Sequence, residues 1–344
     1  MSQALNHLLI GGVLAAAGAC WGCRLGAGGQ RSAEPFKRAG SGELTAASRI
    51  PEAISLLATP LFRPQLGPAS RAHRDEELKL AGTRYRQTPR DEGTIIWLGR
   101  RLAYLGRYHQ AIAVYTDGLS RHPDSYKLLR HRGHRYLTVR RLDDAISDLT
   151  RAGRLIQGVP DEFEPDGLPN PRNIPRSTSH TNIYYHLGLA WYLKGRFEQA
   201  LVAYRRCLEY SANDDMRCAT SYWLYVTLRR LGRDREAAAV LEPIGADMDI
   251  IENFTYHELL LMFKGARSIP QVLGSLSAES IDDATGRYGV GAWHLVNGEQ
   301  ETALEIFQGI TSGPSWPAFG YIAAEAELAR SGQENAVGTP AADS

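Results

Sequence analysis

Four histidines lie near an acidic stretch of the sequence, a combination that could bind a metal or transfer a proton. His131 and His134 are three residues apart, so on a helix they would share a face. With Asp161 or Glu164 they could form a histidine–carboxylate metal site. Their spacing matches no zinc signature, and the acidic stretch lacks the alternating ligands of a calcium loop. The four histidines are His131, His134, His180 and His186.

Motifs of other catalytic families are absent from the sequence. It contains no G-x-S-x-G nucleophile motif, no phosphate-binding P-loop and no G-x-G-x-x-G dinucleotide motif. We therefore predict no catalytic residue, no metal and no cofactor. The alternative is an enzyme or metal-binding protein that uses His131, His134 and His186 with the Asp161–Asp166 region.

Composition restricts the classes of partner. The 344 residues include 39 Lys and Arg and 38 Asp and Glu, which gives a formal charge of +1. This balance lacks the basic footprint of a nucleic-acid-binding protein. A hydrophobic content of 43% with 22% charged residues is typical of a chain that buries a core. Cys207 and Cys218 flank one expected turn and are either buried thiols or a disulfide.

The N-terminal residues resemble an export signal. The apolar stretch Leu8–Ala19 is too short to cross a hydrocarbon core of about 30 Å but suits a signal peptide. Ala17-Gly18-Ala19 fits a cleavage site, and Cys20 resembles the lipid-modified cysteine of a bacterial lipobox, although Ala17 stands where that motif prefers Leu. We predict a signal peptide or apolar anchor over 1–19 and a flexible linker over 20–42. An ordinary secretory signal and an uncleaved apolar N-terminus are the alternatives.

An internal repeat of 33 to 34 residues runs through most of the chain. Ala111 recurs as Ala145, 34 residues later, and Gly232, Gly265 and Gly298 follow at intervals of 33. Each copy reads as an apolar helix, a turn and a second apolar helix. Small residues at fixed positions allow the two helices of a copy to approach closely, and a large residue there would overpack the contact. Among these are Gly99, Gly133, Gly188 and Gly291, and a shift of 34 places Arg140 at the position of Gly106.

This pattern resembles the tetratricopeptide repeat (TPR) family over residues 73–332. The resemblance implies an all-α fold, a right-handed α-solenoid of antiparallel helix pairs without strands, in which stacked repeats share one core. The six repeats are expected at 92–125, 126–159, 181–214, 218–250, 251–283 and 284–317.

The remaining segments follow from this division. We predict N-terminal capping helices over 43–91, including a short helical pattern at Glu43–Ala58. A C-terminal capping helix is expected over 318–332 and a disordered tail over 333–344. The solenoid itself covers 92–317.

A proline-rich insertion at 158–180 interrupts the repeat. Its five prolines exclude a helix and favour a stiff, ordered loop. The helix before it is basic, and Arg132 takes a position that is Leu in other repeats, so it needs Asp148 or the acidic loop as partner. We predict that the loop folds back onto this helix through Arg132 or Arg135; the alternative is a solvated basic face. The structural residues of the loop are predicted to be Asp161, Glu164, Asp166, Asn170 and Asn173.

The resemblance also implies a concave groove lined by the first helix of each repeat. Arginine and aromatic residues there are typical of interface hot spots and favour an acidic or carboxylate-bearing partner. The Lys/Asn set with which co-chaperone members bind a terminal carboxylate is not reproduced in register. The alternative is that the aromatics pack between helices. The predicted partner-binding residues are Arg100, Tyr104, Lys127, Arg130, His131, His134, Asn182, Tyr185, His186, Tyr222 and Arg229.

These observations favour a non-catalytic scaffold or adaptor that binds a protein or peptide partner in the groove. The N-terminus places it in a bacterial cell envelope, either periplasmic or anchored to a membrane through lipidated Cys20; a cytoplasmic location is the alternative. A third hypothesis is an accessory domain of a larger assembly that uses its convex face.

Overall fold

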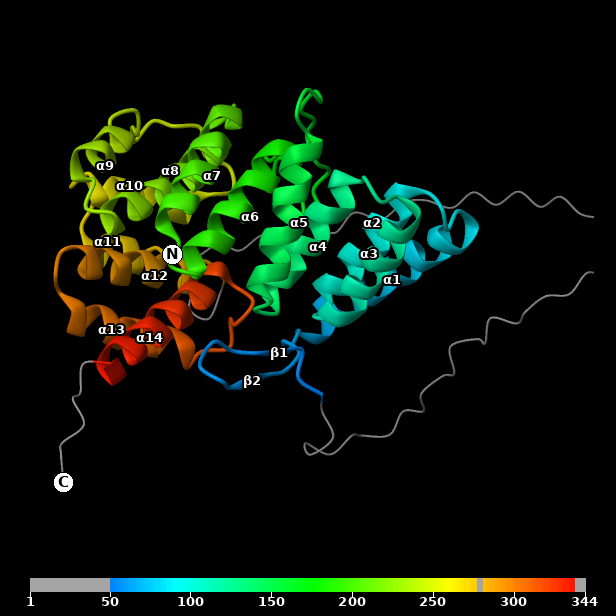
Figure 1. Cartoon of the computed structure of the whole chain (residues 1–344), viewed down its shortest axis with the longest axis horizontal. Coiled ribbons are helices and arrows are strands. Elements are labelled where there is room, and N and C mark those ends of the chain that lie inside the picture. The colour runs from blue at the N-terminus through cyan, green and yellow to red at the C-terminus, as the bar shows by residue number, and fades with distance from the viewer. Residues whose placement is uncertain (1–49, 277–280, 338–344) are drawn as a thin grey trace, which may run out of the picture. The chain divides into compact units, whose positions relative to one another are not determined.

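The computed structural model describes residues 50–276 and 281–337, with the side chains of 281, 282 and 334–337 left out (Figure 1). These residues belong to the unit Ser48–Ser344. The predictions for 1–19, for 20–42 with Cys20, and for the end of the C-terminal tail lie outside the described residues.

Helices account for nearly all the regular structure of the described residues, which is therefore all-α, as predicted. In chain order they are α1 (Pro68–Gln87), α2 (Glu92–Tyr104), α3 (Tyr108–Arg121), α4 (Tyr126–Thr138), α5 (Leu142–Leu155), α6 (Ser179–Leu193), α7 (Phe197–Tyr210), α8 (Asp214–Arg230), α9 (Asp234–Leu241), α10 (Phe254–Phe263), α11 (Ile269–Gly274), α12 (Ile281–Val296), α13 (Gln300–Thr311) and α14 (Phe319–Val337).

From α2 to α13 these helices form six consecutive antiparallel pairs, which correspond to the six expected repeats and make an α-solenoid (Figure 1). Close approach within a pair depends on small residues: a Cβ at Gly99 would overlap the ring of Tyr115, and one at Gly188 would overlap Tyr204. Both tyrosines are fully buried, so these sites admit no larger side chain without repacking.

The turn between the helices of a pair requires a left-handed backbone. Glycine supplies it in five pairs, with φ of 68° to 86°, because it has no Cβ to clash. In the second pair Arg140 takes this position with φ of 65°. A positive φ is energetically unfavourable for an arginine, which indicates that contacts of its side chain hold it in this conformation.

The region before α1 differs from the prediction of capping helices. Residues Ala53–Ile54 (β1) and Pro60–Leu61 (β2) form a small antiparallel hairpin. The Ser55 hydroxyl accepts from the N–H groups of Leu57 and Thr59, and Ala58 has a φ of 61°, so the chain turns where the apolar pattern suggested a helix.

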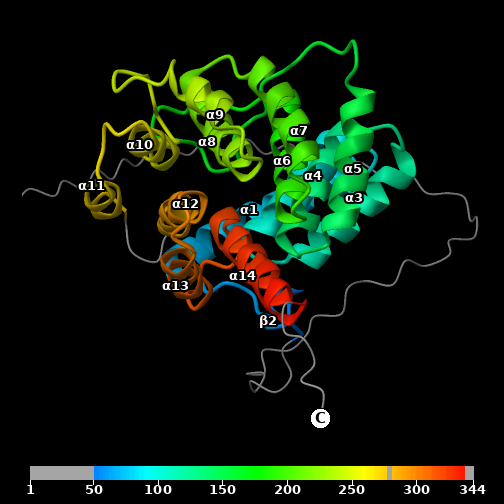
Figure 2. The ribbon, with the colours of Figure 1, turned by 60° about the vertical axis from the view of Figure 1, so that its left-hand side comes forward.

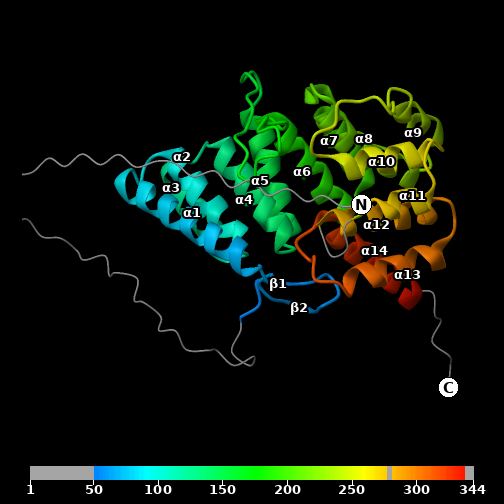
Figure 3. The ribbon, with the colours of Figure 1, turned by 180° about the vertical axis from the view of Figure 1, so that it is seen from behind.

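This hairpin connects distant parts of the chain (Figure 3). The Glu52 carboxylate accepts from the N–H of Tyr108 at 2.9 Å and so satisfies the start of α3. The N–H of Leu56 donates to Glu325 of α14 at 3.3 Å.

The last helix, α14, packs along α12 and α13 and also reaches the second to fourth repeats (Figure 2). Its Glu325 forms a two-bond ion pair with Arg140, at 2.8 and 2.9 Å, and both side chains are at most 3% exposed. Glu327 pairs with Arg230 of α8 at 2.7 Å. The predicted capping helix thus returns to repeats far back in the sequence.

Two further observations complete the fold. Cys207 and Cys218 are free thiols and both are buried. Within 50–276 and 281–337, no helix has both the length and the apolar character needed to cross a membrane.

Candidate interaction surface

The insertion between α5 and α6 is an ordered loop whose two ends pair with each other. The N–H of Glu164 donates to the Ser177 carbonyl at 3.0 Å, and the N–H of Ser179 donates to the Glu162 carbonyl at 2.9 Å. Phe163 and Thr178 form an antiparallel bridge in the same region. The loop is non-helical, as its prolines predict, and its first half is held in an extended conformation.

This first half, residues 161–168, is here called the acidic segment. Its carboxylates are bound by basic side chains of α4: Lys127 Nζ lies 2.6 Å from Glu162, and Arg130 Nη2 lies 3.0 Å from Glu164. The Glu162 pair is half exposed, whereas the Glu164 pair is largely buried.

The main chain of the acidic segment is bound as well, by arginines of α2. Arg100 Nη1 donates to the Pro165 carbonyl at 2.7 Å, and Arg101 Nη1 donates to the Gly167 carbonyl at 2.9 Å. The surface formed by α2 and α4 therefore recognises both the carboxylates and the backbone of an extended chain.

Burial and charge set the protonation of these groups. The hydrogen bond from Lys127 lowers the pKa of Glu162, whereas burial outweighs the charge of Arg130 and raises the pKa of Glu164. Arg130 Nε is buried without a hydrogen-bond partner among the described residues. The Arg130–Glu164 pair is accordingly the more desolvated of the two.

The acidic segment leaves part of this surface hollow. A cleft of about 400 Å³ remains between the segment and the two helices. Three predicted partner-binding residues, Arg100, Lys127 and His131, line it together with Trp97. Arg100 also lies 4.5 Å above the Trp97 ring, a cation–π arrangement.

The loop contacts α4, but through other residues than the sequence suggested. Lys127 and Arg130 bind the acidic segment, whereas Arg132 forms two bonds of 2.7 and 2.8 Å with Asp148 on α5. The prediction of Arg132 or Arg135 as the contact is therefore wrong. Successive residues on a helix point about 100° apart, so an error of two positions selects a different face.

Predicted partner-binding residues of α6 and α8 lie inside the fold. Tyr185 accepts from Trp223 Nε1 at 2.8 Å and bonds the Tyr256 hydroxyl, and Tyr222 is fully buried. Asn182 and His186 are also buried. On this part of the array the packing alternative describes the aromatic residues.

The three remaining predicted partner-binding residues have different surroundings. Arg229 donates to the Val296 carbonyl at 2.9 Å and pairs with Asp234, so it joins α8 to α12 and α9. Tyr104 and half-buried His134 line a second cleft, which lies between residues 64–66, α1, α2, α4 and residues 314–319.

The histidines are packed rather than gathered around a common point. The rings of His134 and His186 lie 4.2 Å apart, and Phe319 of α14 packs against both. Burial holds the pKa of His131, His134 and His186 below the ordinary value, and nearby arginine charges act in the same direction. Among the residues that the structure describes, no three His, Cys, Asp or Glu side chains gather so that they could hold a metal ion.

Asp161 and Asp166, two predicted structural residues of the loop, differ in their contacts. Asp161 accepts from the N–H of His180 and bonds its Nδ1, at 3.0 and 2.6 Å, at the start of α6. Asp166 Oδ2 is buried with no partner in the described part of the chain, and burial raises the pKa of this carboxyl.

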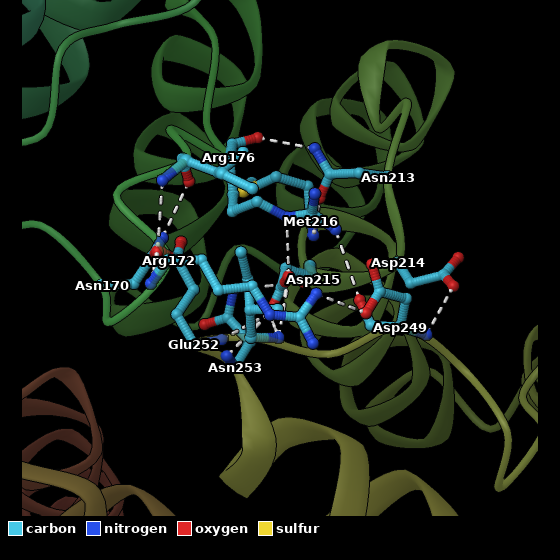
Figure 4. A network of polar contacts seen from close by, with 12 residues as sticks. Asn170, Arg172, Arg176, Asn213, Asp214, Asp215, Met216, Asp249, Glu252 and Asn253 are labelled. Atoms are coloured by element: carbon cyan, nitrogen blue, oxygen red, sulfur yellow. Dashed lines mark hydrogen bonds and ion pairs between the residues drawn. The ribbon is translucent and has the colours of Figure 1, made fainter.

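The second half of the loop ends on a buried carboxylate that sequence reasoning missed (Figure 4). Asp215 of α8 is fully buried, and Arg176 donates to it at 2.7 Å. Asp215 also accepts from the N–H groups of residues 251–253 at 2.9 to 3.2 Å, immediately before α10. Asn170 donates to Glu252 at 2.9 Å in the same network (Figure 4). Asn173 has a φ of 52° in the turn that follows Asn170.

Comparison with known proteins supports the helix-pair pattern. The sequence model of the tetratricopeptide repeat family matches residues 181–214, which cover α6 and α7. This match confirms the resemblance at the third expected repeat. No curated protein sequence matches the chain.

Several solved structures are similar to parts of this chain. A tetratricopeptide repeat protein from Parabacteroides merdae has 15% identity and a TM-score of 0.43, with 71% of this chain and 88% of that protein covered. YrrB, described as a TPR protein with an unusual peptide-binding site, has 15% identity and a TM-score of 0.38, with 75% of this chain and 99% of YrrB covered. MamA from AMB-1 has 18% identity and a TM-score of 0.37, with 51% of this chain and 89% of MamA covered.

Proposed function

We propose that this chain, which carries a tetratricopeptide repeat within an α-solenoid, is a non-catalytic scaffold that binds an extended acidic segment of a protein partner on the surface of α2 and α4. Repeat solenoids present extended surfaces made of preordered helices, so binding there requires little ordering of the scaffold. The partner contributes the flexible chain.

One observation carries this proposal: the surface already binds such a chain. The acidic segment, residues 161–168, places its carboxylates on Lys127 and Arg130. Its carbonyls accept from Arg100 and Arg101. An acidic peptide from a partner protein could form the same charge-assisted hydrogen bonds with its own carboxylates and backbone carbonyls.

The resident segment is held loosely at Glu162 and Phe163, where exchange with a partner segment could begin. The Lys127–Glu162 pair is half exposed, and Phe163, its large aromatic side chain, is 58% exposed. Exposed pairs contribute about 0–1 kcal/mol each. A partner segment with a better apolar anchor can therefore compete for the cleft of about 400 Å³ beside Trp97.

The experiment uses the segment itself as the probe. A fluorescent peptide with the sequence of residues 160–169 is titrated into the full chain and into a variant whose residues 161–168 are replaced by Gly and Ser. We expect the replaced variant to bind the peptide and the parent to bind it at least about tenfold more weakly, because the parent's surface is occupied.

Two controls make the result specific. In the replaced variant, Arg130→Gln should abolish peptide binding, and a scrambled peptide of the same charge should bind weakly. Circular dichroism and a melting curve verify that each variant is folded. Equal peptide binding by the replaced variant with and without Arg130→Gln would rule out this surface as the peptide site.

We also propose that the protein is exported, on the basis of the apolar stretch Leu8–Ala19 and Cys20. Cell fractionation with parent and Cys20→Ser tests this. Membrane association that is lost in the variant supports a lipid anchor, whereas a cytosolic parent contradicts export.

A further inference from the structure

A second cleft, of about 680 Å³, lies among parts of the chain that are distant in sequence. Its walls come from residues 64–66, from α1, from the turn after α2, from α4 and from residues 314–319, with Leu168 of the loop at its edge. This volume lies within the range of small-molecule sites, about 300–1,000 Å³. We call it the Arg135 cleft.

The walls of the Arg135 cleft are mainly apolar and aromatic. Tyr104, Tyr108 and Phe319 line it, together with three prolines. Leu168 is 55% exposed at this site. Such walls can accept an alkyl chain or an aromatic ring.

Two arginines are the charged residues of the lining, which contains no Asp or Glu. Arg74 Nη1 donates to the Tyr104 carbonyl at 2.5 Å. Arg135 is half-buried, and its side chain makes no hydrogen bond or ion pair with any residue that the structure describes; its guanidinium lies 5.7 Å from the centre of the Tyr108 ring. The cleft therefore offers a cation without a counter-charge.

Three other arginines of α4 and the turn after it each have a carboxylate partner, unlike Arg135. Arg130 pairs with Glu164, Arg132 with Asp148 and Arg140 with Glu325. Each of these carboxylates comes from a different element of the chain. Arg135 is left without one, although a partly desolvated guanidinium is stabilised by a carboxylate with two parallel bonds.

We propose that the Arg135 cleft binds a small amphiphilic monoanion, with its carboxylate on Arg135 and its apolar body against Tyr104 and Phe319. A single charge is specified because Arg74 is already engaged by a backbone carbonyl. The Arg135 cleft shares α2, α4 and Leu168 with the surface proposed to bind an acidic peptide. Its cation, Arg135, is not one of the residues that bind the acidic segment, so the two proposals are tested by different variants.

Octanoate and 1-octanol are suitable probes because they share an apolar chain and differ in charge. Isothermal titration of the full chain should show one octanoate site, with octanol at least about tenfold weaker, since a hydrogen-bonded charge contributes that much in a partly buried site. Arg135→Gln should weaken octanoate at least about tenfold and leave octanol unchanged. Arg206→Gln, an exposed arginine paired with Glu209, is the matched control and should bind both probes like the parent.

A second variant tests the position of the site without disturbing the core. Leu168→Glu places a carboxylate at the edge of the cleft, where it can pair with Arg135 and compete with octanoate. We expect Leu168→Glu to lose octanoate binding and Leu168→Gln to retain it. Equal affinity for octanoate and octanol, or octanoate binding that survives both Arg135→Gln and Leu168→Glu, would overturn the proposal.

Discussion

Most of the predicted partner-binding residues fall into two regions that the chain covers in different ways. On α2 and α4 the cover is the acidic segment, held by ion pairs and backbone carbonyls, and a cleft remains beneath it. On α6 and α8 the cover consists of helices α10, α12 and α14, which bury the aromatic residues completely. The first cover resembles a bound ligand and the second belongs to the core.

This difference teaches that burial of a groove residue can have two meanings. A polar cover with one half-exposed ion pair is expected to be held more weakly than an apolar cover with fully buried pairs, which is part of the folding unit. Three ion pairs of decreasing burial, Arg140–Glu325, Arg130–Glu164 and Lys127–Glu162, allow this comparison to be tested.

Breaking the most buried pair should have the largest effect. Glu325→Gln leaves Arg140 buried without a counter-charge, so we expect a loss of about 3–5 kcal/mol in the free energy of unfolding. Urea unfolding followed by circular dichroism measures it. The exposed variant Glu209→Gln is the control, and Arg140→Met with Glu325→Met should recover much of the loss because no charge remains buried. A loss below about 1 kcal/mol for Glu325→Gln would contradict the assignment of α14 to the core.

Removing the charge beneath the acidic segment should have a smaller and more local effect. Glu164→Gln leaves Arg130 partly desolvated, and we expect a loss of about 1–3 kcal/mol. Hydrogen exchange should rise in residues 158–168 and stay unchanged in α14. Equal exchange in both regions would show that the two covers unfold as one.

Acid should destabilise the contact between α6 and α14, where His186 packs against Phe319. Burial lowers the pKa of His186 in the folded state, so below about pH 6.5 the unfolded chain binds the proton and the folded chain does not. Stability therefore falls as the pH falls, by up to about 1.4 kcal/mol per pH unit for this residue. Urea midpoints at pH 7.5 and 5.5 measure the loss, and His186→Asn should reduce it. A pH dependence identical in parent and variant would contradict the linkage.

The half-exposed pair should have the smallest effect. Glu162→Gln removes the partner of Lys127, and we expect a change below about 1 kcal/mol. The difference between parent and variant should shrink further in 0.5 M salt, because exposed charges are screened. A larger, salt-independent loss would place this pair with the buried ones.

Much of the fold could be predicted because the repeat fixes positions within each pair. Gly99 and Gly188 stand where tyrosines of the second helix approach, and the spacing of these small residues is visible in the sequence. The return of α14 could not be predicted, since Arg140 and Glu325 are 185 residues apart and no periodic pattern connects them. The local signal of the Arg140–Glu325 contact is that arginine replaces the glycine found at this turn position in the other pairs.

The candidate site was predicted less completely, for a geometric reason. The acidic loop and the basic helix could be matched by charge, but the choice between Arg130 and Arg132 depends on which face of α4 the loop crosses. The role of Asp215 could not be predicted, because an aspartate at a helix start normally stabilises the N-terminus of its own helix. Here it receives the N–H groups of residues 251–253 instead.

The position of Asp215 has a mechanical consequence. One fully buried carboxylate anchors both the end of the long loop, through Arg176, and the segment that leads into α10 (Figure 4). The loop and the segment before α10 thus share Asp215 as a common anchor, and Asn170 and Arg172 link them further through Glu252 and Asp249. Tension applied to the loop at its far end is transmitted to the start of α10, so the third and fifth helix pairs respond together although a complete repeat separates them in sequence.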